Sequence, residues 1–193
     1  EFGPLINNTS AYFASLNRGK ESIKLNLKEK NDKTIFQKLL SKADILIENF
    51  RPGIMKKLGF EYKILAKKYP GLIYASCSGF GQTGPWADKP AYDMIVQGMG
   101  GLMSLTGHEK HEPVRIGTSI GDITAGLFTT IGILAALVEK NKNNNGQMID
   151  ISMLDCQIAI LENAIARYFA TGQSPGPSGS RHPAIAPFEC YRC

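Results

Sequence analysis

The sequence predicts an α/β fold with a mostly parallel sheet and helical crossovers. Segments 44–50, 72–77 and 147–152 are apolar stretches of strand length, and 72–77 is apolar almost throughout, as buried parallel strands are. Amphipathic helical patterns separate these stretches, which is the order that joins parallel strands through helices. The 193 residues, 43% of them hydrophobic, suffice for one core of ordinary size.

The first third of the chain predicts a strand, a helix and a basic surface. Apolar and polar residues alternate over 22–27, which predicts a half-buried strand. Asn31 or Asp32 then caps a helix, whose apolar stripe ends at Leu40. Residues 18–68 hold 14 Lys and Arg against 6 Asp and Glu, in a chain of net charge +5. Nucleic acid, a membrane surface or a phosphorylated ligand would suit this charge, and solvated helical faces explain it equally well.

Turn residues mark the elements that follow. Segment 51–53 turns into a helix over 54–58, which Gly59 ends, and 62–69 predicts a second basic helix. The loop 79–86 follows a strand and matches GxGxxG, the spacing of a dinucleotide-binding turn. The prolines after it disfavour the helix that such a turn must open. The glycines therefore indicate close approach of backbone to some ligand or neighbouring segment.

Residues 123–138 predict an apolar helix that is buried nearly all round. Asp122 lies at its first turn, where unpaired amides and the helix dipole favour the ionised carboxylate. Gly117 and Gly121 allow other backbone to approach. Asp122 is therefore a candidate nucleophile or base, with a purely structural N-cap as the alternative.

Three further segments complete the chain. A shorter helix begins at Tyr92 and frays at 98–101, and a longer helix covers 154–169. Segment 174–183 is rich in Pro, Gly and Ser and predicts a lid or a linker. Segment 185–191 predicts the start of another strand. Because the chain lacks an initial Met and this strand is cut short, we expect it to be part of a longer protein.

The composition argues against several classes of site and partner. Four cysteines are too few for a disulfide framework and fit a reducing compartment. His108 and His111 lack metal-ligating neighbours, so no metal site is expected, and we attribute the single CxxC of Cys190 and Cys193 to chance. We expect no nucleic-acid binding, since no recognition motif accompanies the basic region. No membrane association is expected either, because Gly and polar residues interrupt every long apolar run and no signal peptide is visible.

Six short motifs stand in a specific order along the chain. They are Asn17–Ile23, Glu48–Gly53 with Leu58–Gly59, Gly79–Pro85, Ala91–Asp93, Gly121–Asp122 and Arg181–Pro183. Together they resemble the class III CoA-transferases, the group of formyl-CoA, carnitine and succinate/hydroxymethylglutarate CoA-transferases, with α-methylacyl-CoA racemase as a sister. The resemblance implies a Rossmann-like large domain, incomplete at both ends. Residues 1–172 would be part of this CoA-binding domain, and 173–193 the loop that leads to the remainder.

The resemblance also implies roles for individual residues. Asp122 matches the acyl-accepting aspartate, and Tyr92 matches a tyrosine near the thioester. Lys57 stands where some members have arginine, and Lys89 lies one place from a family lysine, so Lys89 receives no role. The positions that line the CoA site in the family fall on Leu25, Asn49, Phe50, Ile54 and Lys57.

The implied activity is transfer of CoA between an acyl-CoA thioester and a carboxylic acid through a covalent aspartyl intermediate on Asp122. The CoA thioester is then a substrate, and no tightly bound cofactor is expected. Backbone amides of Gly98, Gly100 and Gly101, along with amides of the parts of the full-length protein that this chain lacks, are candidates for stabilising the oxyanion. The resemblance further implies an interlocked homodimer for the full-length protein, and the cysteines suit the cytoplasm or the mitochondrial matrix.

Three alternatives stay open. A racemase of the sister family needs a second acid or base, and the resembling racemases place a histidine where this chain has Tyr92. A non-catalytic CoA-binding module would have the same fold without the chemistry. Asp155, near the start of its own helix, is a second candidate acid.

Overall fold

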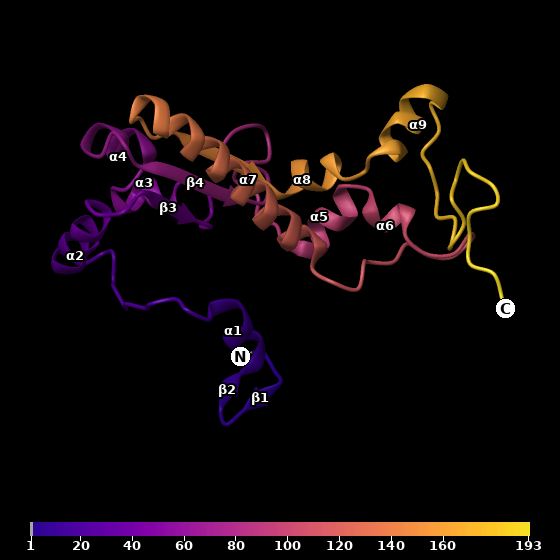
Figure 1. Cartoon of the computed structure of the whole chain (residues 1–193), viewed down its shortest axis with the longest axis horizontal. Coiled ribbons are helices and arrows are strands. Elements are labelled where there is room, and N and C mark those ends of the chain that lie inside the picture. The colour runs from indigo at the N-terminus through magenta and orange to yellow at the C-terminus, as the bar shows by residue number, and fades with distance from the viewer. Residues whose placement is uncertain (1) are drawn as a thin grey trace. The chain divides into compact units, whose positions relative to one another are not determined.

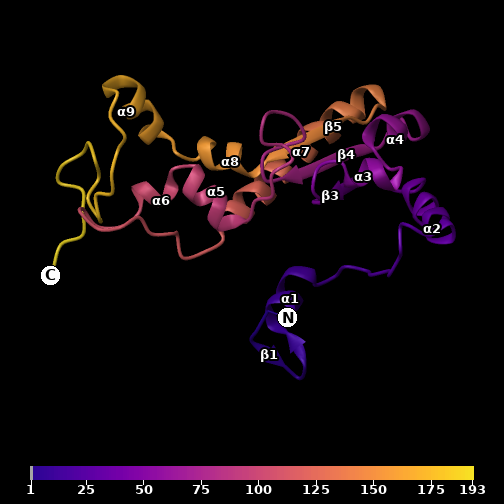
Figure 2. The ribbon, with the colours of Figure 1, turned by 180° about the vertical axis from the view of Figure 1, so that it is seen from behind.

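The computed structural model describes residues 2–193 of the chain. Two compact units are present, of which the first ends at Lys38 and the second comprises Leu39–Cys193. Figure 1 labels most elements of both units, and Figure 2 shows the same ribbon from behind, with β5 labelled. The sequence-based division at residue 172 stays a prediction.

The first unit holds a hairpin and a short helix. β1 (Leu5–Ile6) pairs antiparallel with β2 (Thr9–Ser10), and α1 (Ala11–Asn17) follows directly. Ser10 caps α1, since its hydroxyl accepts a hydrogen bond from the N–H of Phe13 at 3.1 Å.

No strand forms over 22–27, so the prediction of a half-buried strand there is wrong. These residues pair with no strand in the described part of the chain, and Ile23 is 58% exposed. An alternating pattern produces a strand only where a neighbouring strand takes up its backbone hydrogen bonds. α2 (Lys30–Leu40) begins one residue before Asn31, and Asp32 lies in its first turn, so neither residue is the predicted cap.

A three-stranded parallel sheet forms the centre of the second unit. Its strands are β3 (Ile45–Glu48), β4 (Ile73–Ser78) and β5 (Met148–Ser152), in that spatial order, which confirms the three strands predicted in this region. β4 lies between the other two and is almost wholly buried, as its continuous apolar run predicts. Because the strands are parallel, the residues that follow them emerge at one edge of the sheet.

Helices connect the strands, which confirms the predicted crossovers. α3 (Ile54–Leu58) and α4 (Tyr62–Lys68) join β3 to β4. α5 (Asp93–Met99), α6 (Leu102–Leu105) and α7 (Ile120–Asn143) join β4 to β5. α7 lies along both β4 and β5, as Figure 2 shows. The glycine loop after β4 opens no helix before α5, contrary to a dinucleotide-binding turn.

α7 packs through its small residues, so the prediction that it is buried nearly all round is wrong. Its buried residues are small apart from Ile133, whereas the aliphatic side chains of the predicted apolar stripe are exposed; the buried residues are Gly121, Thr124, Ala125, Thr129, Ile133 and Ala136. Small side chains allow the helix backbone to approach the sheet closely, which decides the buried face. The exposed residues at helical spacing are Ile123, Leu127, Ile131, Leu134 and Val138.

The C-terminal part of the chain departs from the predictions in two places. The helix expected over 154–169 is interrupted, giving α8 (Met153–Ala159) and α9 (Asn163–Thr171). Glu162 stands at the interruption with φ of 49° and ψ of −116°, which is not helical. No strand forms over 185–191, and no described strand lies beside this segment, so that prediction is also wrong.

α7 also meets the length and composition expected of a membrane span. Its mean hydropathy reaches 1.7 in an 18-residue window that is 33% buried. The sequence-based argument that this run is too interrupted to span a membrane is therefore not supported. Core helices of soluble proteins pass the same test, so the absence of membrane association stays a prediction.

Candidate active site

One cavity of about 220 Å³ lies where the segments after β3 and β4 meet the start of α7. Asn49 and Phe50 come directly after β3, Tyr92 precedes α5, and Asp122 lies in the first turn of α7. Four of the residues that the resemblance singles out thus line a single cavity. Its other lining residues are Arg51, Pro52, Ser78, Gly79, Lys89, Pro90, Ala91 and Met153.

The other three residues lie elsewhere. Ile54 and Lys57 belong to α3 and do not line this cavity. Lys57 is exposed and Ile54 is half-buried. Leu25 is half-buried in the first unit. Their CoA-binding roles stay predictions.

The carboxyl group of Asp122 has a pKa above its ordinary value. Loss of hydration at the cavity wall is the larger cause, and the negative charge of Asp93 is the second. The expectation that the N-terminus of α7 favours the ionised form is therefore wrong in net effect. A carboxylate with a raised pKa is more basic, and hence a stronger nucleophile once it is ionised.

Two cationic side chains share the cavity with Asp122. They are Arg51, from the loop after β3, and Lys89, from the loop before α5. The Lys89 ammonium also lies 5.3 Å from the centre of the Trp86 ring, a cation–π contact that supports its position. Lys89, which has no role in the sequence-based interpretation, is thus placed to meet an anion near Asp122.

Buried Glu48 holds the loop that carries Phe50. Its Oε2 accepts a hydrogen bond from the N–H of Phe50 at 2.8 Å, and its Oε1 accepts one from the hydroxyl of Ser76. The Ser76 oxygen in turn accepts a hydrogen bond from Nε2 of Gln82 at 2.9 Å. This network joins the ends of β3 and β4 to the glycine loop, so the cavity wall rests on buried polar contacts.

Two further contacts tie the cavity loops together. The side-chain amide of Asn49 donates a hydrogen bond to the carbonyl of Cys77 at 2.6 Å. A Cβ atom at Gly79 would lie 2.5 Å from the Cβ of Ala91, so only glycine permits the loop to approach the segment before Tyr92. The glycine loop therefore makes its predicted close approach to a neighbouring segment of the same chain, at Ala91.

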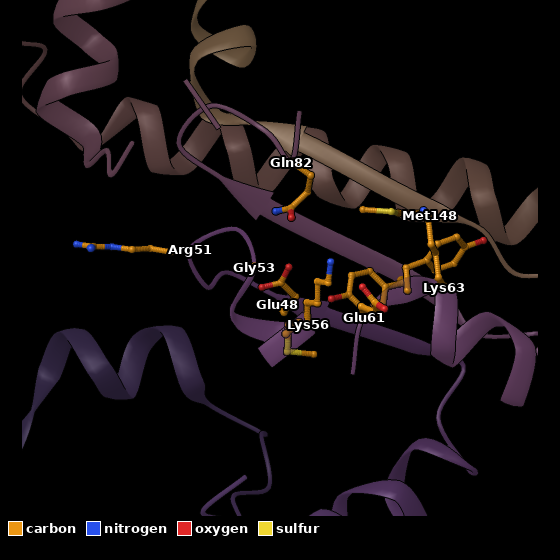
Figure 3. A pocket seen from close by; sticks show the side chains of 11 residues that line it. Glu48, Arg51, Gly53, Lys56, Glu61, Lys63, Gln82 and Met148 are labelled. Carbon is orange, nitrogen blue, oxygen red and sulfur yellow. The ribbon is translucent and has the colours of Figure 1, made fainter. Parts of the chain in front are cut away.

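A second cavity, of about 310 Å³, opens beside Glu48 (Figure 3). Lys56 and Lys63 line it together with Glu61. Arg51 lines both cavities, and Figure 3 shows its side chain extending away from the other labelled residues. Both cavities therefore border the loop that follows β3.

The glycines at the end of α5 do not supply free amides. The N–H of Gly100 donates to the carbonyl of Val96 at 2.8 Å, and that of Gly101 donates to the carbonyl of Gly98 at 3.3 Å. None of the three glycines lines the cavity of Asp122. Their predicted role as oxyanion donors is wrong, because the helix end uses these groups itself.

The remaining candidates also lie away from Asp122. Asp155 is exposed in the first turn of α8 and lines a different pocket. The rings of His108 and His111 are 6.2 Å apart in an exposed loop. Cys190 and Cys193 are exposed free thiols. Within residues 2–193, no three His, Cys, Asp or Glu side chains gather as a metal site, and the absence of a metal stays a prediction.

Three residues with clear contacts at the site receive no role from the sequence. Glu48 ends an otherwise apolar strand, and an acid in that place is a signal of a buried hydrogen-bonded group. Asp93 and Gln97 are four residues apart, at a spacing that pairs side chains on one helix face. Their contacts with Ile116, before α7, and with Gly121, in α7, join residues more than 18 positions apart, so no local pattern reveals them.

Comparison with known proteins places this geometry in a family. The family model described as CoA-transferase family III matches residues 1–193. The chain belongs to this family. The resemblance stated from the six motifs is therefore confirmed.

Named relatives of this family member are CoA-transferases. An acetyl-CoA:oxalate CoA-transferase of Acetobacter aceti is 50% identical over 99% of this chain and 49% of its own length. A succinate–glutarate CoA-transferase of Agrobacterium fabrum is 42% identical over 95% of this chain and 46% of its own length. The chain thus spans about half the length of the curated relatives it matches.

Solved structures confirm the α/β fold of the family member. A CaiB/BaiF family protein from Brucella suis superimposes with a TM-score of 0.89 at 40% identity, covering 95% of this chain and 49% of that protein. A protein of Mycobacterium tuberculosis gives a TM-score of 0.74 at 28% identity, covering 82% of this chain and 44% of that protein.

Proposed function

We propose that the protein is a CoA-transferase that moves CoA from an acyl-CoA thioester to a carboxylic acid, with Asp122 as the acyl-accepting group. The observation that carries this proposal is the cavity in which Asp122 meets Asn49, Phe50 and Tyr92. Family membership supports the general activity, and the raised pKa of Asp122 supports its use as a nucleophile.

The first exchange releases the donor acid. A carboxylate oxygen of Asp122 attacks the thioester carbonyl carbon, the C–S bond breaks, and CoA leaves as the thiolate. The product is a mixed anhydride between Asp122 and the acyl group. The thiolate then attacks the Asp122 carbonyl of this anhydride, which forms an aspartyl-CoA thioester and frees the donor as its carboxylate.

The second exchange loads the acceptor by the same steps in reverse. The acceptor carboxylate attacks the aspartyl-CoA thioester, which gives a new anhydride and the CoA thiolate. Attack of the thiolate on the acceptor carbonyl forms the new acyl-CoA and restores the Asp122 carboxylate. No oxidant, reductant or net proton transfer is needed in either exchange.

Each of these steps places a negative charge near Asp122. Attack builds an oxyanion, departure of CoA creates a thiolate, and the acceptor enters as an anion. The cations of Arg51 and Lys89 line the same cavity and would stabilise these charges. Lys56, Lys57 and Lys63 add positive charge on and after α3, which suits the phosphates of CoA.

The names of the relatives point to a class of acceptor. The two relatives described above are named for oxalate, succinate and glutarate, all of which are anions of dicarboxylic acids. We therefore propose a short dicarboxylate as the acceptor of this protein. The two cations at the cavity provide a partner for a second carboxylate as well as for the reacting one.

Trapping of the intermediate tests the proposal. The full-length protein is incubated with succinyl-CoA or acetyl-CoA and hydroxylamine, and peptides are analysed by mass spectrometry. We expect a hydroxamate on Asp122, and no hydroxamate or CoA exchange in Asp122→Asn. Glu139→Gln, which removes an exposed carboxylate at the far end of α7, serves as the matched control.

Other outcomes identify the alternatives. Exchange that persists in Asp122→Asn would refute the proposed nucleophile. Exchange of the α-proton in a branched acyl-CoA, without a hydroxamate, would indicate a racemase. Binding of acyl-CoA without either reaction would indicate a non-catalytic module.

Assembly and location extend the proposal. We propose an interlocked homodimer for the full-length protein, which light scattering after size-exclusion chromatography measures directly. The reduced cysteines suit the cytoplasm or the mitochondrial matrix, and fractionation of cells distinguishes the two.

A further inference from the structure

Asp93 uses both oxygens of its carboxylate to join α5 to the start of α7. Its Oδ1 accepts a hydrogen bond from the N–H of Gly121 at 2.8 Å. Its Oδ2 accepts one from Nε2 of Gln97 at 2.8 Å and lies 3.7 Å from Nη1 of Arg115. The Asp93 side chain is 12% exposed, so these partners replace most of its water.

The hydrogen bond to Gly121 replaces a cap that α7 lacks. Gly121 is the second residue of α7, and its N–H belongs to the first turn, where no helical carbonyl is available. Ser119, the N-cap residue, makes no side-chain capping bond. A carboxylate from α5 therefore caps α7, where the positive end of the helix dipole stabilises it.

Gln97 fixes the same junction from a second direction. It is fully buried, and its Oε1 accepts a hydrogen bond from the N–H of Ile116 at 2.9 Å. Its Nε2 donates both to Asp93 and, at 3.3 Å, to the carbonyl of Thr118. The segment that leads into α7 and the first turn of α7 are thus held by one pair of side chains.

Asp122 directly follows Gly121, so this junction sets where the nucleophile lies. We propose that Asp93 is a positioning residue that holds in place the backbone carrying Asp122; this inference rests on the proposed function. The negative charge of Asp93 already contributes to the raised pKa of Asp122.

Asp93→Asn tests the inference with little change of shape. An Asn side chain must point an NH₂ group at a donor, either Gln97 Nε2 or the N–H of Gly121, so the junction loosens. We expect kcat to fall about 10-fold to 100-fold while KM for acyl-CoA changes by less than about threefold, because misplacement of a reacting group costs this much. Assays use succinyl-CoA with glutarate and acetyl-CoA with oxalate in the full-length protein.

The pH profile provides a readout that a merely structural role would leave unchanged. Removal of the Asp93 charge should lower the pKa of Asp122, so the acidic limb of kcat/KM moves to lower pH. The other charged and ionisable neighbours, which this variant does not change, are Arg115 beside Asp93, Arg51, Lys89 and Tyr92 at the cavity, and Cys77 on β4.

The outcomes separate this inference from the proposed function. The positioning role alone would be overturned if Asp93→Asn had the kcat and the acidic limb of the wild type while Asp122→Asn lost exchange. Exchange that persists in Asp122→Asn would overturn the proposed function. If Asp93→Asn does not fold, Asp93→Glu decides, because it keeps the charge but lengthens the side chain that accepts from Gly121; a kcat that stays as in the wild type then overturns the inference. Glu139→Gln should match the wild type throughout.

Discussion

Glu48 and Phe50 are joined by a hydrogen bond of 2.8 Å from the backbone N–H of Phe50 to Oε2 of Glu48. This hydrogen bond to the carboxylate at the end of β3 stabilises a turn in the residues that follow the strand. Glu48 is only 7% exposed and also accepts a hydrogen bond from the Ser76 hydroxyl, so the turn is anchored inside the protein. The side chains of Phe50 and Arg51 are then directed toward the cavity of Asp122 by a buried group.

Glu48→Gln should loosen this turn. The new NH₂ group either faces the N–H of Phe50, which then loses its acceptor, or faces Ser76, whose buried hydroxyl must turn to accept from it and loses its own acceptor. We expect the free energy of unfolding to fall by about 1–3 kcal/mol, as measured by urea denaturation, and KM for acyl-CoA to rise. Glu139→Gln, at an exposed position, should change neither quantity, and equal effects in both variants would contradict the anchoring role.

Gly121→Ala and Gly126→Ala form a matched pair on α7. A Cβ at Gly121 would lie 2.6 Å from Cγ2 of Val96 and 3.0 Å from Oδ1 of Asp93, whereas one at Gly126 meets nothing within 4 Å. Gly121→Ala should destabilise the fold by roughly 1–3 kcal/mol through overpacking. Gly126→Ala should stabilise it by about 0.5–1 kcal/mol through helix propensity. Thermal unfolding measures both, and effects of the same sign would contradict the packing of α5 on α7.

Lys89→Met should weaken catalysis without unfolding the protein. The substitution removes a cation from the cavity of Asp122 and leaves an apolar side chain of similar length. We expect kcat/KM for acyl-CoA transfer to fall about tenfold or more, as for loss of one electrostatic contact to a developing anion. Lys42→Met, at an exposed position outside both cavities, is the control. Unchanged kcat/KM in Lys89→Met would exclude an electrostatic role.

Asp122→Asn should gain stability while it loses activity. The folded state raises the pKa of Asp122, so ionisation of this group opposes folding at pH values above that pKa. At neutral pH the variant should be more stable by a few tenths of a kcal/mol, a small effect because the group is exposed to solvent. The difference should shrink as the pH falls and the wild-type carboxyl is protonated. Urea titrations across this range measure it, and a variant less stable at neutral pH would contradict the cause given for the pKa.

Local sequence patterns predict an element correctly where its environment is the same on all sides or where a single residue ends it. β4 is buried on both faces, and its unbroken apolar run predicts it directly. The helix over 54–58 and its end at Gly59 also follow from local residues, since Gly59 adopts the left-handed conformation with φ of 85°. The alternating segment 22–27 fails as a strand for the opposite reason, because a strand depends on a partner that no local pattern supplies.

The candidate site divides in the same way. Asp122, Tyr92, Asn49 and Phe50 are identified by their motifs and by the resemblance that those motifs carry, and the structure brings all four to one cavity. The contacts that hold them are not visible in the sequence. Asp93 meets Gly121 across 28 positions, and Glu48 meets Ser76 across another 28.

The sequence by itself determined the family, the presence of three parallel strands with helical crossovers, and the aspartate at the start of α7. Only the tertiary structure decided which face of α7 is buried and which way the pKa of Asp122 shifts. The spacing of apolar residues shows where they recur along α7, but not which side of the helix meets the sheet. The place of Asp122 in the first turn shows only that the helix dipole acts on its carboxyl group. The buried face of α7, the hydration of Asp122 and the distance to the charge of Asp93 depend on segments that are far apart in the sequence. At Asp122, desolvation and the charge of Asp93 outweigh the helix dipole, so the pKa is raised.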